Sequence, residues 1–370
     1  MKIGLNLSHL VPGETGGSEI YARRLVEGLL DVDPGLEPTL FVSREAAGEQ
    51  WPDRVEVVSL KVPARSRVAR VAAEQTLLPA AVARSRVELL HNLFTTAPVV
   101  PTVPQVTTIH DLIYKRFPEA HAGLLSYGMR VLVPLAARRS RRIIAVSQAT
   151  KTDVVRFLGV AAERIDVTYE GPGLAAPIDA TPEHELRERF GLGEAPIVLT
   201  VSAKRPHKNL ERLFEAFARV DTDAVLVVPG YETPFERELR RRAAALAASR
   251  VRFTGWVDDA SLEALYRAAV CLVFPSLAEG FGLPVLEALA RGVPVACSNT
   301  SSIPEIAGEA ALYFDPVDTA AIARAMERLL GDESLRERLS GAGRLRAGRF
   351  SWQATAERTV ETYRRALEQR

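Results

Sequence analysis

Short, continuous apolar runs alternate with longer segments of helical periodicity along the whole chain, and this alternation constrains the fold more than any other feature. Seven such runs lie before residue 172 and six lie after it. Runs that are apolar at every position, such as residues 143–146 and 225–228, are typical of strands buried on both faces. Parallel sheets covered by helices meet this condition, so the sequence predicts two doubly wound α/β domains in succession.

The 370 residues also suggest two domains. A stretch rich in Gly, Pro and Ala at 171–184 separates the two sets of runs, which predicts a first domain over 1–172 and a second over 173–350. Residues 351–370 predict an amphipathic helix that packs on the nearer domain or crosses back to the first. Its apolar stripe consists of Trp352, Ala356, Val360, Tyr363 and Leu367.

The charge balance excludes one class of partner and suggests another. Lys and Arg number 47 against 46 Asp and Glu, a net charge of +1, which argues against a nucleic-acid-binding protein. Residues 61–90 carry a local excess of four positive charges and residues 115–142 an excess of six, both interleaved with apolar residues. Such segments predict contact with an anionic membrane surface, and solvated helix faces are the alternative.

Three features that the sequence lacks bear on its redox chemistry and its cellular location. The only cysteines, Cys271 and Cys297, lie in apolar runs without metal-ligand spacing, so buried inert thiols are expected. No apolar run reaches the length of a membrane-spanning helix, and the first residues are too short for a signal peptide. The sequence therefore predicts a cytoplasmic protein.

Glycines follow the first predicted strand, at Gly13, Gly16 and Gly17, directly before a predicted helix. Glycine lets a ligand approach the backbone closely, and a helix N-terminus favours phosphate. The spacing fits neither the dinucleotide fingerprint nor the P-loop, which disfavours a nicotinamide enzyme and an NTPase. A capping loop without a ligand is the alternative.

Four potential cations lie on one predicted strand-to-helix loop, at Lys204, Arg205, His207 and Lys208. Cations near a helix N-terminus oppose the helix dipole unless an anion joins them. The loop therefore predicts a diphosphate site, and a solvated surface cluster is the alternative.

The segment after the strand at 271–274 has the most specific pattern in the chain. Glu279 and Glu287 are separated by seven residues, and Gly280 and Gly282 let this loop press against a ligand. A carboxylate near a helix N-terminus is favourable, so Glu287 also fits a structural role. His110 follows another predicted strand, where hydrogen bonding and catalysis are both open.

Two acidic triplets resemble a metal-binding pattern but lie in the wrong place. Asp31 and Asp33, like Asp221 and Asp223, occur where a helix ends and a strand begins, away from the edge where ligands bind. No metal site is predicted.

Taken together, these segments resemble the retaining glycosyltransferases of the glycogen-synthase-like superfamily, and within it the bacterial group-1 family that builds cell-surface polysaccharides. The resemblance runs from about residue 2 to residue 368, and residues 274–315 carry its most specific part. It implies the GT-B fold, in which two Rossmann-like domains face a central cleft. It also implies that the second domain binds a nucleotide-sugar donor and the first binds the acceptor.

The resemblance assigns roles to individual residues. It places Glu279 by the donor sugar, Glu287 on the ribose hydroxyls, Lys208 on the diphosphate and His110 near the donor sugar, so that Glu279, His110 and Lys208 are the expected catalytic residues. Two further groups are expected to line the phosphates and the sugar through their backbone: Gly16 and Gly17, and Phe281, Gly282 and Leu283.

The chain departs from the family pattern at two positions. The arginine expected five residues before the lysine is Ala203, so Arg205 or Lys204 would supply the second diphosphate cation. The family's Tyr-Asn-Gly is Tyr169-Glu170-Gly171 here, and no side-chain amide role carries over.

The function expected from this resemblance is metal-independent transfer of a hexose, with mannose favoured, and no cofactor. GDP-mannose is the favoured donor and a UDP-sugar the alternative, and the acceptor would be a glycan, a lipid-linked sugar or a small molecule. The enzyme would work in the cytoplasm, peripherally at the inner face of the plasma membrane. Two other functions stay open: a nucleotide-sugar epimerase or hydrolase on the same scaffold, and a non-catalytic nucleotide-sugar-binding protein.

Overall fold

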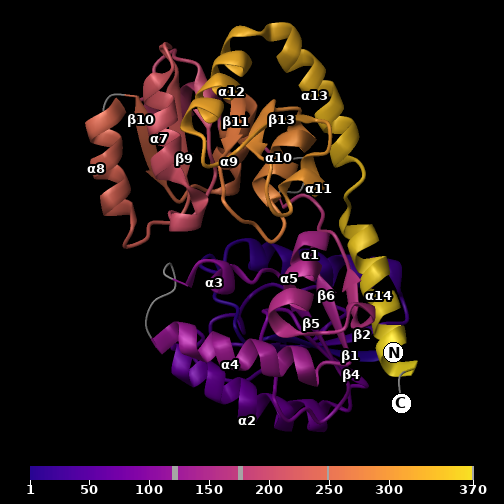
Figure 1. The fold of residues 1–370 in the computed structure, drawn as a ribbon. Coiled ribbons are helices and arrows are strands. Elements are labelled where there is room, and N and C mark those ends of the chain that lie inside the picture. Colours follow the sequence, from indigo (N-terminus) through magenta and orange to yellow (C-terminus); the bar gives the residue numbers. More distant parts are fainter. Residues whose placement is uncertain (119–123, 174–177, 248–249, 369–370) are drawn as a thin grey trace. The chain divides into compact units, whose positions relative to one another are not determined.

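Two parallel β-sheets organise the chain, and each lies in one of two structural units (Figure 1). The computed structural model describes residues 1–118, 124–173, 178–247 and 250–368. Unit 1 comprises Met1–Gly171 together with Phe350–Arg370, and unit 2 comprises Pro172–Arg349. The chain thus leaves unit 1 after Gly171 and returns to it at Phe350.

The sheet of unit 1, within the described residues, has the order β3-β2-β1-β4-β5-β6-β7, and every neighbouring pair is parallel. The strand order reverses between β1 and β4. The strands are β1 (Lys2–Leu7), β2 (Glu37–Val42), β3 (Glu56–Ser59), β4 (Leu89–Asn92), β5 (Gln105–Ile109), β6 (Arg142–Ala145) and β7 (Ile165–Val167).

The sheet of unit 2 has the order β10-β9-β8-β11-β12-β13 and is parallel in the same way over the part of the chain that is described. Its order reverses between β8 and β11. Its strands are β8 (Ile197–Leu199), β9 (Val225–Pro229), β10 (Val251–Gly255), β11 (Ala269–Phe274), β12 (Val295–Ser298) and β13 (Ala311–Phe314). Each apolar run of the sequence contains one strand, which confirms the predicted pair of doubly wound sheets.

Helices cover the sheets and connect their strands. In unit 1 they are α1 (Gly17–Val32), α2 (Arg67–Ser85), α3 (Ile113–Arg116), α4 (Leu124–Arg139), α5 (Gln148–Leu158), the 3-10 turn η2 (Ala162–Arg164) and α14 (Trp352–Glu368). In unit 2 they are α6 (Glu183–Phe190), the 3-10 turn η3 (Pro206–Lys208), α7 (Leu210–Arg219), α8 (Glu236–Ala247), α9 (Asp259–Ala268), α10 (Leu283–Arg291), α11 (Ile303–Ala307), α12 (Thr319–Gly331) and α13 (Glu333–Ala347).

Several helices start where a side chain accepts a hydrogen bond from the first turn. Ser147 caps α5 through Thr150 N, Asp258 caps α9 through Ser261 N, and Asp332 caps α13 through Leu335 N. Such caps satisfy backbone N–H groups that have no partner inside the helix, and each contributes about 1 kcal/mol. Local sequence therefore determines where these helices begin.

Helix α14, yellow in Figure 1, packs against α1 and forms part of the core of unit 1. Ala356, Val360 and Tyr363 are buried in the cluster that also contains the apolar residues of β1. Gly171 leaves room for the start of this helix, since a Cβ there would lie 2.7 Å from the backbone nitrogen of Trp352. The sequence left two alternatives open for this helix, and in the structure it belongs to unit 1.

Among the residues that the structure describes, none of the helices combines the length and the apolar character needed to cross a lipid bilayer.

Candidate functional site

The ion pair between Lys208 and Glu279 lies at the reversal point of the unit 2 sheet. Lys208 ends η3, which follows β8, and Glu279 lies in the loop after β11, the neighbouring strand. Lys208 Nζ lies 2.6 Å from Glu279 Oε1, and their side chains are only 15% and 9% exposed. Open α/β sheets bind ligands outside the carboxyl ends of their strands at such a point. The structure therefore brings these two predicted residues together where a ligand is expected.

Hydrogen bonds from neighbouring loops fix the backbone around this pair. Asn209 adopts a left-handed conformation with φ 58°, and its side-chain amide donates to the carbonyls of Pro275 and Pro316. Ser301 Oγ donates to the Glu279 carbonyl at 2.6 Å and accepts from the Glu279 N–H at 3.1 Å. These bonds hold the loop that carries Glu279 in one conformation.

Gly282 caps the N-terminus of the helix that carries Glu287, the second glutamate of the pattern. It has φ 113°, a conformation that favours glycine, and it precedes Leu283, the first residue of α10. Phe281 is buried, and its carbonyl accepts from Ser302 Oγ at 2.7 Å. Glu287 is buried on α10, and its Oε2 accepts from the Tyr266 hydroxyl on α9 at 2.8 Å. One oxygen of Glu287 therefore already has a protein partner.

Lys204 and Arg205, the two candidates for a second cation, differ in their surroundings. Lys204 is fully buried, and its ammonium donates to the Gly230 carbonyl at the end of β9. Burial is the main cause that lowers the pKa of Lys204 to about 8. Arg205 is exposed on the same loop, so it is better placed than Lys204 to meet an anion from solvent.

The glycine loop of unit 1, which contains Gly13, Gly16 and Gly17, is held by hydrogen bonding to Glu19. Gly16 has φ 63° and caps α1, of which Gly17 is the first residue. Glu19 Oε2 accepts from the backbone N–H of Gly13 at 2.9 Å, and Glu19 also pairs with Arg23. The loop therefore has a defined conformation at the N-terminus of α1.

His110 follows β5 and lies between two hydrogen-bond acceptors. Its Nε2 lies 2.8 Å from the Leu93 carbonyl oxygen, and its Nδ1 lies 3.4 Å from Glu170 Oε1. The ring of Tyr21 meets it edge-on, with the centroids 4.8 Å apart. Glu170 comes from the segment after β7 and is buried. The structure thus places the unexpected glutamate of the sequence beside the predicted histidine.

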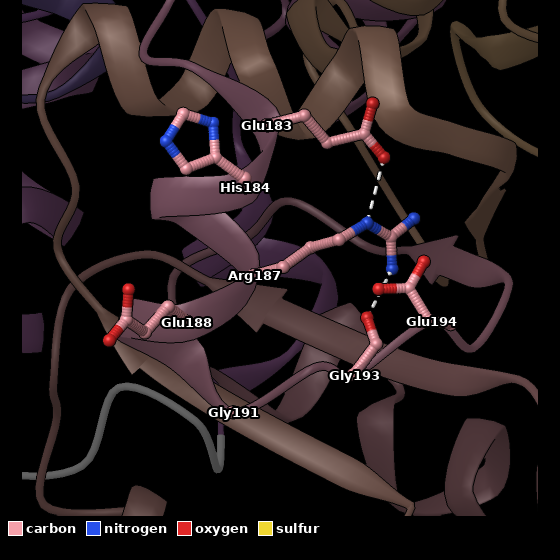
Figure 2. Close-up of a pocket in the computed structure, with 7 residues that line it drawn as sticks. All are labelled: Glu183, His184, Arg187, Glu188, Gly191, Gly193 and Glu194. Atoms are coloured by element: carbon pink, nitrogen blue, oxygen red, sulfur yellow. Dashed lines mark hydrogen bonds and ion pairs between the residues drawn. The ribbon is translucent and has the colours of Figure 1, made fainter.

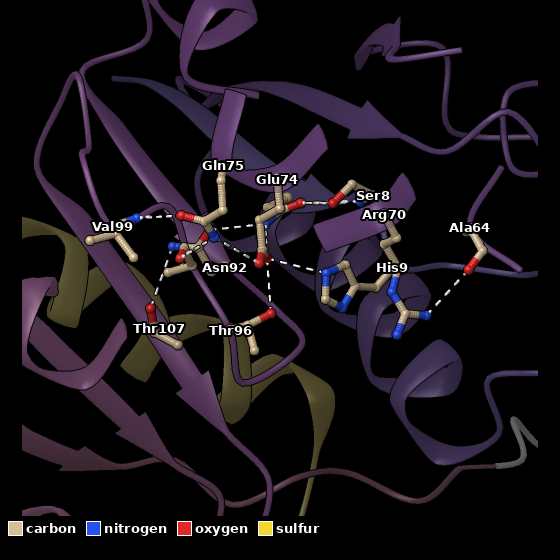
Figure 3. Close-up of polar contacts among 12 residues, drawn as sticks. Ser8, His9, Ala64, Arg70, Glu74, Gln75, Asn92, Thr96, Val99 and Thr107 are labelled. Atoms are coloured by element: carbon tan, nitrogen blue, oxygen red, sulfur yellow. Dashed lines mark hydrogen bonds and ion pairs between the residues drawn. The ribbon is translucent and has the colours of Figure 1, made fainter. Parts of the chain in front are cut away.

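A second group of polar side chains lies where the strand order of unit 1 reverses (Figure 3). Glu74 on α2 is fully buried, and it faces His9 Nε2 at 3.2 Å. It also accepts from Thr96 Oγ1 at 2.9 Å and from the Asn6 amide at 3.3 Å. Burial alone would raise the pKa of the Glu74 carboxyl, but His9 and these hydrogen bonds outweigh burial and lower it. A carboxylate is therefore buried, ionised and hydrogen-bonded at this edge.

Sequence reasoning missed Glu74, although the sequence contains a signal for it. Glu74, Leu78 and Val82 are spaced by four residues, so they share one face of α2, and that face is buried. The loop after β4 is also unusual, because Thr95 has φ 68°, which is rare for a β-branched residue. Strained backbone of this kind tends to occur at functional sites.

One open pocket of about 520 Å³ lies in unit 2 (Figure 2). It is formed by α6 and the turn that follows, and Arg187 there donates to Glu183 and to the Gly193 carbonyl. None of the predicted site residues lines it, so it carries no functional assignment. In the described part of the chain, no cluster of His, Cys, Asp and Glu is suited to hold a metal ion.

Comparison with known proteins assigns both units to glycosyltransferase families. Residues 15–172 match Glycosyltransferase Family 4, and residues 183–346 match Glycosyl transferases group 1. The chain is 31% identical over 271 residues to O-antigen chain mannosyltransferase B of Escherichia coli, covering 70% of each protein. It is 30% identical over 247 residues to an MMP alpha-(1->4)-mannosyltransferase of Mycolicibacterium hassiacum, covering 65% of this chain and 58% of that protein.

One further relative is much longer than this chain. The chain is 32% identical over 274 residues to the serotype-specific mannosyltransferase WbdA of Escherichia coli, and the match spans 71% of this chain but only 34% of that protein.

Solved structures share the fold over the whole chain. Sucrose-phosphate synthase from Thermosynechococcus elongatus has a TM-score of 0.81 at 22% identity, covering 100% of this chain and 99% of that one. Anabaena HepE in complex with UDP and glucose has a TM-score of 0.76 at 21% identity, covering 99% and 100%. These similarities confirm the predicted GT-B fold. The chain belongs to the group 1 family of glycosyltransferases.

Proposed function

We propose that this glycosyltransferase is a retaining enzyme that moves a mannose-like hexose from a nucleotide-diphosphate sugar to a glycan or lipid-linked acceptor without a metal ion. The observation that carries this proposal is the Lys208–Glu279 pair between the loops after β8 and β11. A cation at this position suits a diphosphate, and a carboxylate beside it suits the hydroxyls of the sugar.

The transfer places negative charge on the leaving diphosphate. The bond between the sugar C1 and the diphosphate oxygen breaks, a bond from C1 to the acceptor hydroxyl oxygen forms, and the acceptor proton passes to the leaving phosphate. Lys208 and the exposed Arg205 would stabilise the developing charge, which is the role that a metal ion has in other transferases. The N-terminus of α10, at Gly282 and Leu283, adds backbone N–H groups.

Binding of a diphosphate would change the partner of Lys208. In the structure its ammonium is bonded to Glu279 at 2.6 Å, and the phosphate oxygens would compete for the same N–H groups. The Glu279 carboxylate would then be available to orient the hydroxyls of the donor sugar. Glu287, whose Oε2 accepts from the Tyr266 hydroxyl, is proposed to accept from the ribose hydroxyls.

GDP-mannose is the favoured donor and a UDP-sugar the alternative. The names of the relatives at about 30% identity support mannose, because three of them are mannosyltransferases. The HepE structure, which contains UDP and glucose, supports the alternative. No cofactor is proposed.

The acceptor is proposed to be presented at an anionic membrane surface, which α2 and α4 would contact. Val68 on α2 is 82% exposed and Val131 on α4 is 58% exposed, and Arg138 and Arg139 near the end of α4 are exposed as well. Exposed apolar side chains beside cations fit the interface of an anionic bilayer.

Three arginines that raised the charge count of residues 115–142 have partners within unit 1. Arg142 is buried and forms a 2.5 Å ion pair with Asp166, and Arg141 donates to the Ala366 carbonyl of α14. Arg116 is likewise paired with Asp153 at 2.6 Å. The expectation that Arg141 and Arg142 are free to meet a membrane is therefore wrong, and the surface charge is smaller than the sequence suggests.

The reaction class is tested by incubating the protein with labelled GDP-mannose or a UDP-sugar, with and without a lipid-linked acceptor, in the presence of EDTA. We expect label on the acceptor only, with the anomeric configuration retained. An isomerised or free sugar would instead indicate an epimerase or a hydrolase, and no conversion at all would indicate a binding protein. Loss of activity in EDTA that returns with magnesium or manganese would contradict the metal-independent route.

Replacing Lys208 removes the proposed diphosphate cation. Lys208→Met keeps the aliphatic length of the side chain and should cost about 2–4 kcal/mol of transition-state stabilisation, roughly 30- to 1,000-fold in kcat. Arg219→Met, at an exposed position at the end of α7, is the matched control and should leave kcat unchanged. Near wild-type turnover of Lys208→Met would rule out its role.

The two glutamates should respond differently to the loss of charge. Glu279→Gln should lower kcat and leave the affinity for free nucleoside diphosphate largely intact, because its proposed partner is the sugar. Glu287→Gln should weaken nucleoside diphosphate binding itself, which calorimetry measures without any acceptor. Unchanged nucleotide affinity in Glu287→Gln would mean that the ribose has another partner.

Membrane contact is measured by co-sedimentation with vesicles. The protein should bind vesicles that contain phosphatidylglycerol but not pure phosphatidylcholine, and salt should weaken binding. Replacing Arg138 and Arg139 by Gln should cost about 2 kcal/mol, roughly 30-fold in affinity, at about 1 kcal/mol per cation. The same change at Arg219 and Arg328 in unit 2 is the control. Absence of binding to anionic vesicles at low salt would favour a small-molecule acceptor.

A further inference from the structure

The hydrogen-bond partners of His110 determine how many protons its ring carries. Nε2 faces the Leu93 carbonyl oxygen at 2.8 Å, and Nδ1 faces Glu170 Oε1 at 3.4 Å. A carbonyl and an ionised carboxylate can only accept, and a neutral imidazole has one N–H. Both contacts are satisfied together only when each ring nitrogen carries a proton.

The charged and titratable groups around His110 favour that form. Burial alone would lower the pKa of His110, but the hydrogen bond and the charge of Glu170 outweigh it, helped by the Leu93 carbonyl and the charge of Asp111. The net effect raises the pKa of His110. Tyr21 meets the ring edge-on and adds no charge, because burial holds the pKa of its hydroxyl well above 10.

His91, the nearest other histidine, has the opposite character. Burial, with the nearby charge of His110, lowers its pKa to about 3. Its Nδ1 lies 2.7 Å from the Tyr363 hydroxyl and its Nε2 lies 2.8 Å from Thr108 Oγ1. A hydroxyl can donate or accept, so these partners suit a neutral ring. The surroundings within unit 1 thus shift the two histidines in opposite directions, lowering the pKa of His91 and raising the pKa of His110.

We propose that Glu170 is a positioning residue that keeps His110 doubly protonated and fixes its ring, so that unit 1 holds a permanent cation at the carboxyl end of β5. The consequence for catalysis rests on the proposed transfer reaction. The resemblance to group-1 transferases implies that His110 meets the donor sugar, and a fixed positive charge there would stabilise negative charge on the departing diphosphate. With both N–H groups engaged, His110 acts by its charge and accepts no proton from the acceptor.

The proposal also predicts how this pair contributes to stability as the pH changes. The pKa of His110 is higher in the folded protein than in the unfolded chain. The ion pair therefore stabilises the fold fully below the ordinary histidine pKa, and this contribution is lost as the pH rises through the folded value. Glu170→Gln should remove that part of the pH dependence.

Histidine NMR tests the charge directly and needs no donor or acceptor. In protein labelled with ¹⁵N-histidine, His110 is assigned by the signal that disappears in His110→Asn. We expect both ring nitrogens to be protonated in the wild type at pH 7, and the titration midpoint in Glu170→Gln to fall by about one pH unit or more. Glu163→Gln, an exposed position in the same unit, should leave the midpoint unchanged.

Two NMR results would overturn the proposal. One is a wild-type ring that is unprotonated at Nδ1 at pH 7, which would mean that Glu170 holds the proton. The other is the same midpoint in the wild type and in Glu170→Gln. If Glu170→Gln fails to fold, Glu170→Asp, which keeps the charge, provides the comparison, and it should retain a doubly protonated ring.

The pH profile of kcat separates a charge role from a structural one. The alkaline limb of the wild-type profile should follow the titration of His110, and in Glu170→Gln it should move to lower pH by the shift that NMR measures. Activity should approach that of the wild type at the acidic end, whereas structural damage would lower kcat equally at every pH. A shifted NMR midpoint without any glycosyl transfer would refute the proposed function but leave the charge assignment intact.

Discussion

Burial of both faces of a parallel sheet is the constraint on which the rest of this protein depends. Strands that run in one direction need crossover helices, and these helices cover the sheet on both sides. All strands then end at the same edge, and the loops that follow them can present polar side chains to a ligand there. Lys208 and Glu279 in unit 2, like His110 and Glu170 in unit 1, come from loops at that edge.

Both units place a carboxylate against a cation or an imidazole at this edge, in surroundings that exclude most water. Removing two charges from water costs about as much as their attraction returns, so such pairs add little net stability. What they provide is a fixed direction for each side chain and a defined charge. Glu74 follows the same pattern, since Thr96 and Asn6 donate to its buried carboxylate and His9 Nε2 lies 3.2 Å from it.

The fold and the family could be predicted from the sequence because both depend on short segments. Each strand is a continuous apolar run, and the loop that carries Glu279 has a distinctive local pattern. Side-chain partners could not be predicted, because they come from distant segments. From the sequence alone, Arg142 is predicted to be a surface charge, but the structure pairs it with Asp166. Likewise, the sequence shows Glu170 only as a departure from the family pattern, and the structure places it beside His110.

The return of the chain from unit 2 to unit 1 has a consequence for the order of events during synthesis. The core of unit 1 requires Ala356, Val360 and Tyr363 of α14, which leave the ribosome after all of unit 2. Domains generally fold from the N-terminus as they emerge, but here the second unit is complete first. Until α14 is synthesised, Tyr21 and His91 lack their contacts with Trp352 and Tyr363, so part of the interior of unit 1 stays uncovered.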